Sequence, residues 1–428
     1  MIKLNENKQF TENKPIEKLP TPKFVHIPLI HHIGKPCENL EVKLKDEVSV
    51  GQRLSSASVQ IFAPVHSSVS GRVIAIEDWP HPVLGKTKAI TIEVKDNNIP
   101  EFKTKSIDDV KKLTPEEIRN IIFEAGIVGM GGASFPTYIK LNPPNKINNL
   151  IINGAECEPY LTADYRLMLE KTEEILLGIK VVAKCLGVEN IYIAIEDNKP
   201  EAINKFSNAL KASGCELRAK VKVLKSMYPQ GGEKQLVRSI LNREIPRGKL
   251  PFDIGVVVQN VATVFAIYEA VFLGKPLYER VVSVIGSSLA NSKNILAPIG
   301  ATAKDLIDFC GPLKEEPAKV IFGGPMMGIA QFSFDTPVIK STNGILLLNK
   351  NEIDAPKDDF CIRCGACVRQ CPAGLMPCLI NLASEKKMWK EALFYGAGDC
   401  IECGVCSYVC PSNRNLVQSI KRAKLEIK

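Results

Sequence analysis

The sequence has 428 residues and 45% apolar side chains, which is long enough for several globular domains rather than one. Its 55 basic and 47 acidic residues leave a formal net charge of +8, without the block of like charges that marks a nucleic-acid-binding arm. The longest apolar stretch, residues 254–274, is interrupted by Gln259, Asn260 and Glu269, so it falls short of a lipid-spanning helix.

The chain begins with a polar segment, residues 1–22, which we predict to be a flexible, solvated leader without a core of its own. Short β-branched runs separated by glycine follow over residues 23–96 and predict a small all-β domain. Residues 48–54 and 63–74 resemble the barrel sandwich of biotinyl and lipoyl domains. No lysine lies where such carrier domains attach their prosthetic group, so we expect a scaffold.

Residues 107–278 alternate between helical and strand patterns, which predicts a doubly wound, mostly parallel sheet with its ligands at the carboxyl ends of the strands. Thr114, Pro115 and Glu117 begin its first long helix with a capping box. A further stretch, residues 279–340, fits a small β-grasp, SLBB-like unit. The predicted strands are 150–152, 191–195, 219–224, 281–285 and 319–322, and the predicted helices are 118–124, 167–186, 201–212, 233–241 and 303–310.

Two cysteine runs near the end of the sequence share the spacing C-x2-C-x2-C-x3-C-P. This spacing wraps cubane iron–sulfur clusters in two-cluster ferredoxins, where the fourth cysteine of each run ligates the other cluster. We therefore predict a mostly helical domain over residues 355–428 that holds two [4Fe-4S] clusters. The ligands are assigned as Cys361, Cys364, Cys367 and Cys410 for one cluster, and Cys400, Cys403, Cys406 and Cys371 for the other.

Structural zinc and disulfides are the alternatives for these cysteines. A tetrahedral zinc site has no role for a third cysteine at the same interval, and none of the five histidines lies near either run. Disulfides need an oxidising compartment, whereas the charged N-terminus has no signal segment, which favours the cytoplasm. The remaining cysteines lack metal-ligand spacing and are expected to be ordinary thiols: Cys37, Cys157, Cys185, Cys215, Cys310 and Cys378.

A glycine-rich loop, residues 126–140, contains Gly129, Gly131 and Gly132 and ends in Lys140. Glycines let backbone amides approach a phosphate or a flat ring, and the lysine adds positive charge. Such a loop alone is equally typical of a close backbone approach. Three further segments favour a binding site, and they are residues 153–159, 228–233 and 259–263.

In this order the four segments resemble the FMN- and NADH-binding flavoprotein subunit of respiratory complex I. With the β domain before them and the cubane motifs after them, residues 24–415 resemble the RnfC family. Its members belong to the membrane-bound Rnf complexes, which couple electron transfer between ferredoxin and NAD to ion translocation. The resemblance implies an oxidoreductase with noncovalent FMN, two [4Fe-4S] clusters and NAD(H) as substrate. It implies ferredoxin and the membrane subunits as partners, no nucleic acid, and a peripheral position on the cytoplasmic side of the membrane.

The resemblance also implies roles for individual residues. The glycine loop and Lys140 would hold the FMN phosphate and ribityl chain, the isoalloxazine edge would meet two asparagines and Glu156, and Tyr228 would line the nicotinamide side. Glu156 and Glu233 are the predicted catalytic residues. The predicted cofactor-binding residues are Gly129, Gly131, Gly132, Lys140, Asn153, Glu156, Glu158, Tyr228, Gly231, Gly232, Glu233, Asn260 and Thr263.

Three positions depart from the complex I pattern, because Ala155 and Gly232 stand in place of acidic residues and Gln259 in place of an asparagine. Each departure loses a polar contact. Two other functions stay open: a soluble flavin and iron–sulfur reductase similar to cobalamin reductase, and a non-catalytic electron-relay subunit with a degraded flavin pocket. Domain order argues against the first, and only the three departures support the second.

Overall fold

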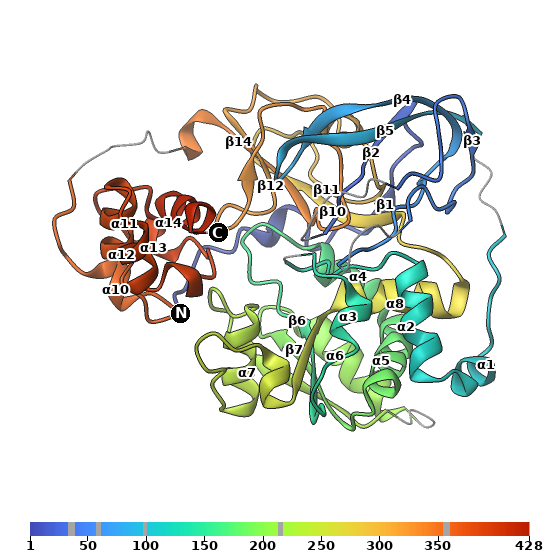
Figure 1. The fold of residues 1–428 in the computed structure, drawn as a ribbon, viewed down its shortest axis with the longest axis horizontal. Coiled ribbons are helices and arrows are strands. Elements are labelled where there is room, and N and C mark those ends of the chain that lie inside the picture. Colours follow the sequence, from blue (N-terminus) through green and yellow to red (C-terminus); the bar gives the residue numbers. More distant parts are fainter. Residues whose placement is uncertain are drawn as a thin grey trace.

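The computed structural model describes residues 1–32, 39–56, 61–96, 101–132, 134–212, 217–353 and 360–427. These residues form three β-sheets and a helical C-terminal domain that projects from the rest of the molecule (Figure 1). Cys37, Cys215 and the first residues of the predicted cluster domain, 355–359, lie outside the described residues. No helix among the described residues combines the length and the apolar character needed to cross a membrane.

The N-terminal β domain has a four-stranded sheet in the order β2-β5-β4-β3. Its centre is a long antiparallel hairpin whose residues Val73 and Ile90 are fully buried. Residues 40–44, one of the short apolar runs within the predicted all-β domain, form no strand in the structure, because the carboxylate of Asp46 accepts the N–H of Lys43 and turns the chain. The strands are β2 (Phe24–Pro28), β3 (Glu47–Val48), β4 (Ser70–His81) and β5 (Gly85–Asp96).

The second sheet is parallel throughout, in the order β8-β7-β6-β9. Its strands are β6 (Asn149–Gly154), β7 (Asn190–Glu196), β8 (Ala219–Leu224) and β9 (Val256–Asn260). The helices around it are α1 (Ile107–Lys112), α2 (Pro115–Glu124), α3 (Thr137–Lys140), α4 (Ala163–Glu170), α5 (Thr172–Leu186), α6 (Pro200–Lys211), α7 (Glu233–Leu241) and α8 (Val261–Leu273), with a 3-10 turn η2 (Pro251–Ile254).

Helices cover both faces of this sheet, as the alternation of strands and helices predicts. Leu150 and Ile152 face the larger core, which includes residues of α2, α5 and α8, whereas Ile151 faces a smaller core with α7. The chain runs outward from β6 through β7 to β8 and then returns to place β9 on the other side of β6. Ligands of doubly wound sheets bind at this kind of switch point, beyond the carboxyl ends of the strands.

One expectation for this domain is wrong in detail. The single helix expected over 167–186 is two helices, because Lys171 leaves the helical conformation and the Thr172 hydroxyl binds the carbonyl of Met168 at 2.7 Å. The apolar stretch 254–274 contains β9 followed by α8. Both elements are buried on nearly all sides, so they form one continuous apolar run in the sequence.

The third sheet has six strands in the order β1-β11-β10-β14-β12-β13, and it extends past the predicted limits of 279–340 at both ends. Helix α9 (Ala303–Phe309) packs into its core with a capping box at Thr302. The central strand β14 comes from after residue 340, and the edge strand β1 comes from the N-terminal segment. The strands are β1 (Ile16–Lys18), β10 (Glu279–Ile285), β11 (Lys293–Pro298), β12 (Lys319–Phe322), β13 (Ile329–Ala330) and β14 (Gly344–Leu348), followed by the turn η3 (Lys350–Glu352).

The N-terminal segment is packed against the rest of the protein, so the prediction of a solvated, flexible leader over residues 1–22 is wrong. Lys8, in the turn η1 (Lys8–Phe10), is 6% exposed and Thr11 is fully buried. Ile2 pairs with Tyr228, and β1 runs parallel to β11. In Figure 1 the N-terminus lies beside the helical domain. The segment has too few apolar residues for its own core, but it completes cores built by residues far along the chain.

The C-terminal domain is helical, as expected, and its two cysteine runs have matching local geometry. Gly365 and Gly404 have φ values of 73° and 76° and each begins a short helix, α10 or α13. Each glycine supplies the left-handed turn that brings the cysteines on either side together. The elements are α10 (Ala366–Arg369), α11 (Pro377–Glu385), α12 (Trp389–Phe394), η4 (Ala397–Asp399), α13 (Val405–Tyr408) and α14 (Leu416–Glu426).

One cavity of this domain is lined by the thiols of Cys371, Cys400, Cys403 and Cys406, the four predicted ligands of one cluster. Of the first three cysteines of the other run, Cys361 and Cys364 are exposed and Cys367 is buried. The cavity thus joins the fourth cysteine of the first run to the first three of the second. This juxtaposition supports the predicted exchange of the fourth ligand.

The substitution Cys371→Ser tests that exchange. We expect the reconstituted wild type to hold about eight irons per chain, and the variant to lose or distort the cluster of Cys400, Cys403 and Cys406 while the other cluster keeps its spectrum. Iron analysis with Mössbauer and EPR spectroscopy checks this. Cys185→Ser, which removes a buried thiol of the parallel-sheet domain far from both cysteine runs in the sequence, is the control and keeps both clusters. Damage confined to the cluster of Cys361, Cys364 and Cys367 would refute the assignment.

Candidate functional site

The switch point of the parallel sheet brings together Asn153, near the end of β6, and Asn260, at the end of β9. Asn260 caps α8, since its Oδ1 accepts the N–H groups of Ala262 at 2.9 Å and Thr263 at 3.3 Å. Its Nδ2 donates to Oδ2 of Asp164 at 2.6 Å. Both ends of this side chain are therefore fixed at the start of a 13-residue helix, where the helix dipole favours negative charge.

The glycine loop lies directly against this helix start. The N–H of Met130 donates to Oγ1 of Thr263 at 2.9 Å, which anchors the loop. A Cβ atom on Gly131 would lie 2.8–2.9 Å from the side chain of Asn260, so only glycine fits there without displacement. At Gly132 a Cβ atom would meet no described atom within 4 Å. The loop therefore contacts Asn260 closely at Gly131 and borders open space at Gly132. A loop that binds a ligand through its backbone needs both features.

The segments 153–159 and 228–233 are joined by direct hydrogen bonds. Nδ2 of Asn153 donates to the carbonyl of Gly231 at 2.9 Å, and the N–H of Gly231 donates to Sγ of Cys157 at 3.2 Å. Burial raises the pKa of the Cys157 thiol to about 12, so it acts here as an inert acceptor. Glu233, which follows the helix-capping Gly232 and begins α7, forms an ion pair with Lys140 at the end of the glycine loop.

Glu156 and Asp164 form a close acidic pair behind Asn260. The backbone of Glu156 is left-handed, with φ of 47°, and its carboxylate accepts the N–H groups of Asp164 at 2.8 Å and Tyr165 at 3.0 Å. This carboxylate therefore fixes the start of α4, and its predicted catalytic role stays a prediction. Burial, followed by the charge of Glu156, raises the pKa of Asp164 to about 7. Sequence reasoning missed Asp164, because no spacing rule links it to the other segments.

Glu158 and Tyr228 point toward the helical domain and the loop between β12 and β13. The carboxylate of Glu158 accepts the N–H groups of Met326 at 2.7 Å and Met327 at 3.0 Å, and burial raises its pKa. Tyr228 is 1% exposed, and its hydroxyl donates to the carbonyl of Cys403 at 2.8 Å. The structure thus gives Tyr228 an interdomain contact rather than an open face for nicotinamide, because its phenol finds a buried acceptor there.

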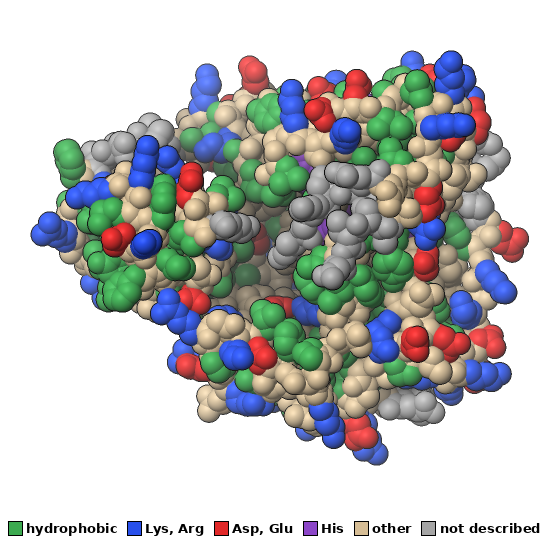
Figure 2. Space-filling view, viewed as in Figure 1, with side chains coloured by type: hydrophobic (Ala, Val, Ile, Leu, Met, Phe, Trp, Pro, Cys, Tyr) green, Lys and Arg blue, Asp and Glu red, His purple; other side chains and the backbone are tan. Residues whose placement is uncertain are grey.

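An apolar cluster surrounds this contact. Its members come from the N-terminus, the segments 153–159 and 228–233, the β12–β13 loop and the cluster domain. They are Ile2, Leu4, Cys157, Tyr228, Met326, Ile401, Cys403, Val405 and Val409. Cys403 also lines the cavity of the helical domain described above, so that cavity lies beside the segments at the switch point. Elsewhere in Figure 2 a recess separates the helical domain from the rest of this face.

The residues fit the groups that the sequence predicts. Cys371, Cys400, Cys403 and Cys406 line one cavity, and four cysteines are the donor set that a [4Fe-4S] cluster requires. The glycine loop, the capped start of α8 and the cation of Lys140 fit the phosphate and ring of a flavin nucleotide. Of the predicted flavin residues, Glu158 and Tyr228 alone have their side-chain contacts directed to other domains.

Solved structures with a related fold include a chain of NAD+-reducing [NiFe]-hydrogenase in the H2-reduced state. It is 15% identical, with a TM-score of 0.53, and the match covers 78% of this chain and 69% of that chain. The same enzyme in the air-oxidized state gives a TM-score of 0.51 at 20% identity, with 67% and 56% of the two chains covered. At such low identity the likeness concerns the fold alone.

Three known families match consecutive parts of the sequence. Residues 2–97 match the RnfC barrel sandwich hybrid domain, residues 122–269 the Nuo51 FMN-binding domain, and residues 353–421 the 4Fe-4S dicluster domain. The predicted cofactors, FMN and two [4Fe-4S] clusters, follow from these domains.

Full-length relatives agree with this domain order. The C subunit of the proton-translocating ferredoxin:NAD(+) oxidoreductase complex of Clostridium ljungdahlii is 46% identical, with 99% of this chain and 92% of the relative covered. Its counterpart in the Na(+)-translocating complex of Acetobacterium woodii is 43% identical, with 98% and 94% covered. That of the ion-translocating complex of Rhodobacter capsulatus is 41% identical, with 98% and 80% covered. The chain therefore belongs to the RnfC family, whose members are subunits of the ion-translocating ferredoxin:NAD(+) oxidoreductase complexes, the Rnf complexes.

Proposed function

We propose that this chain is the NAD(H)-reacting subunit of an Rnf-type complex and that the switch point of its parallel sheet is the flavin site. The observation that carries the proposal is the direct contact between that site and the cluster domain, where the Tyr228 hydroxyl binds the Cys403 carbonyl at 2.8 Å. A bound flavin accepts a hydride as two electrons and releases them singly, which is the conversion that joins NAD(H) to iron–sulfur clusters. Residues for both halves of this conversion meet at one interface.

Each side chain of the site has a distinct task in this proposal. Asn260 and the glycine loop hold the flavin nucleotide, with Lys140 neutralising its phosphate while Glu233 fixes the lysine. Asn153 holds the 228–233 turn in place. Asp164, whose raised pKa lies near neutrality, holds a proton close to Asn260. Glu156 and Glu233 remain the carboxylates assigned to catalysis, Glu156 through its control of Asp164.

Partners and location follow from the complex to which the relatives belong. The exposed thiols Cys361 and Cys364 lie in the run that is not beside the flavin segments, which favours that side of the domain for contact with ferredoxin or another subunit. NAD(H) as the substrate favours the cytoplasmic side of the membrane, with attachment through the membrane subunits. Ion translocation belongs to those partner subunits in this proposal.

A non-catalytic relay is the second candidate function, supported by the lost polar contacts at Ala155, Gly232 and Gln259. Of these, Gln259 is 1% exposed and its Nε2 has no hydrogen-bond partner among the described residues. A relay subunit would hold clusters without reacting with NADH. Anaerobic purification followed by flavin analysis and NADH-dependent bleaching of the clusters separates the two functions.

The substitution Gly131→Val should abolish FMN binding. A branched side chain would displace Asn260, which lies within 3 Å of the position of the new Cβ atom. The clusters belong to a separate domain and should keep their iron, but NADH should no longer reduce them, because no two-electron acceptor remains. Released flavin, iron content and anaerobic bleaching are the measurements. NADH-driven cluster reduction in a variant proved free of flavin would sink the proposal.

The substitution Gly132→Ala separates ligand space from local folding. A Cβ atom here meets no described atom within 4 Å, so the free protein should keep the thermal stability of the wild type. We expect FMN affinity to fall, because the methyl group enters the space that the cradle leaves for the ligand. Unchanged affinity would place the flavin elsewhere.

The substitution Asp164→Asn should flatten the dependence of stability on pH. The pKa of Asp164 is raised from its ordinary value of 3.8 to about 7, so the folded protein holds this proton more tightly than the unfolded chain. Wild-type unfolding free energy should therefore fall relative to the variant as pH rises from about 4 to about 7. Denaturant titrations of flavin-free protein at pH 5 and pH 8 check this. Asp108→Asn, an exposed change on α1, should leave the dependence as in the wild type, and identical slopes for all three proteins would contradict the expectation.

A further inference from the structure

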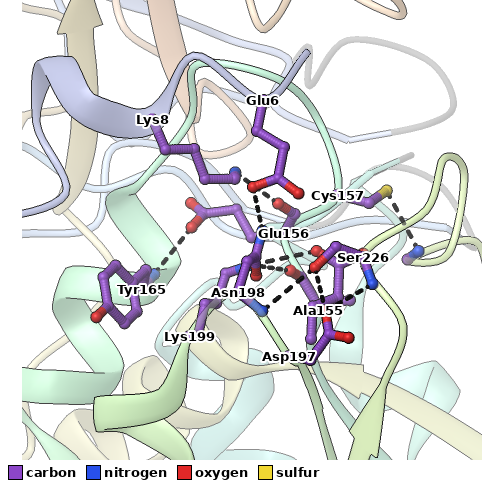
Figure 3. Close-up of polar contacts among 12 residues, drawn as sticks. Glu6, Lys8, Ala155, Glu156, Cys157, Tyr165, Asp197, Asn198, Lys199 and Ser226 are labelled. Carbon is purple, nitrogen blue, oxygen red and sulfur yellow. Dashed lines mark hydrogen bonds and ion pairs between the residues drawn. The ribbon is translucent and has the colours of Figure 1, made fainter. Parts of the chain in front are cut away.

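Two buried lysines bind backbone carbonyl groups of the segment 155–161, which belongs to the proposed flavin site (Figure 3). Lys8 Nζ donates to three carbonyl oxygens of the segment, and Lys199 Nζ donates to a fourth. The four carbonyls and their distances are Glu156 at 2.8 Å, Glu158 at 3.2 Å and Leu161 at 2.7 Å from Lys8, and Ala155 at 2.6 Å from Lys199. The two lysines are 6% and 1% exposed.

The N-terminal segment holds Lys8 in this position from both sides. The N–H of Tyr160 donates to the carbonyl of Glu6 at 2.8 Å, and the hydroxyls of Thr11 and Thr162 lie 2.6 Å apart. The carboxylate of Glu6 also accepts Nδ2 of Asn198 at 2.7 Å. Residues 6–11 are therefore bound to the flavin-site segment on both sides of Lys8. A lysine at another position would not reach the same carbonyl groups.

The positive charge of the pair is only partly neutralised. Lys199 forms a buried ion pair with Glu196 at 3.2 Å. Lys8 forms no ion pair with a described carboxylate within 4.0 Å, and burial together with the charge of Lys199 lowers its pKa. The nearby charges of Glu156 and Glu196 offset only part of the cost of burying this cation, which is otherwise held by carbonyl dipoles. Such a cost is expected where the buried charge has a function in the adjacent flavin site.

The geometry of the peptide bond gives this charge a direction. In a trans peptide the carbonyl oxygen and the following N–H point to opposite sides. The N–H of Glu156 therefore points away from Lys199, and the N–H of Cys157 points away from Lys8. Neither N–H donates to a described residue. The left-handed φ of 47° at Glu156 is the conformation that lets successive N–H groups form an anion-binding nest.

We infer that Lys8 and Lys199 are positioning residues of the flavin site, which hold the 155–161 segment from behind and direct the N–H groups of Glu156 and Cys157 toward the flavin ring. The inference rests on the proposed function. Peptide dipoles whose negative ends are bound by ammonium groups offer positive ends to the ligand, and they favour the reduced, anionic flavin over the neutral oxidised form. The N-terminal segment is then a working part of the site and not a leader.

The substitution Lys8→Met in the full-length protein with both clusters tests the inference. Lys3→Met is the matched control, because Lys3 lies in the same segment, carries the same charge and is exposed. We expect Lys8→Met to weaken binding of reduced FMN about tenfold more than binding of oxidised FMN, which lowers the two-electron midpoint potential of bound FMN by about 30 mV. Lys3→Met should change neither quantity. Fluorescence titration and anaerobic redox titration of the flavin are the measurements.

The outcomes separate this inference from the proposed function. Equal weakening of oxidised and reduced FMN, with an unchanged potential, would make Lys8 merely structural and overturn the inference alone. Should Lys8→Met fail to fold, Lys8→Arg and Lys199→Gln decide: the arginine variant, which keeps the charge, must retain the wild-type potential, and the glutamine variant must lower it. Wild-type protein that binds no FMN would overturn the proposed function as well.

Discussion

The contact of Tyr228 with Cys403 is the constraint on which the arrangement of the domains depends. A protein that converts hydride transfer into single-electron transfer must keep a flavin site and a cluster at a fixed separation, although they belong to different domains. The phenol of Tyr228 belongs to the flavin-like domain and its acceptor to the cluster loop, and both are buried. Burial makes this hydrogen bond costly to break without a replacement, so the two domains are held together at this point.

Other parts of the chain reinforce the same junction. The β12–β13 loop lies between Glu158 and the cluster domain, and a glycine at each of the two contacts permits close approach. A Cβ atom on Gly324 would collide with the side chain of Glu158, and one on Gly404 would lie 2.6 Å from the carbonyl of Met326. Small residues therefore let the third sheet, the flavin-like domain and the cluster loop meet without a gap. The N-terminal residues Ile2 and Leu4 complete the apolar cluster.

Local signals in the sequence predicted much of this fold. Helix α7 and strands β8 and β12 have the expected limits, and the capping box of Thr114 begins α2 as predicted. Turn, capping and cysteine-spacing rules depend on neighbours within about ten residues, which is why they succeed. The resemblance to the complex I subunit, and not these local rules, brought the glycine loop, Asn153 and Asn260 into one candidate site. The structure places them together where parallel strands present their carboxyl ends at one edge.

These local rules could not predict the features that depend on residues far apart in the sequence. The N-terminal segment looks solvated because its partners, from Glu156 onward, are more than a hundred residues away. The break at Lys171 has no glycine or proline to mark it. Tyr228 was assigned to a ligand because its motif is shared with complex I, whereas its acceptor lies 175 residues later in the chain. Asp164 acquires its raised pKa only when folding buries its carboxyl group and brings the charge of Glu156 beside it.

The parallel pairing of β1 with β11 has a consequence for the order in which the protein assembles during synthesis. Lys8 meets its carbonyl partners 148 to 153 positions later in the chain, but Lys14, next to β1, binds the carbonyl of Ser292, 278 positions later. At ribosomal rates of roughly 5–20 residues per second, the two events are separated by roughly 6–25 s. The nascent N-terminus can be captured at Lys8 first, and that early capture would keep the unpaired β1 backbone tethered near its own chain until β11 emerges from the ribosome.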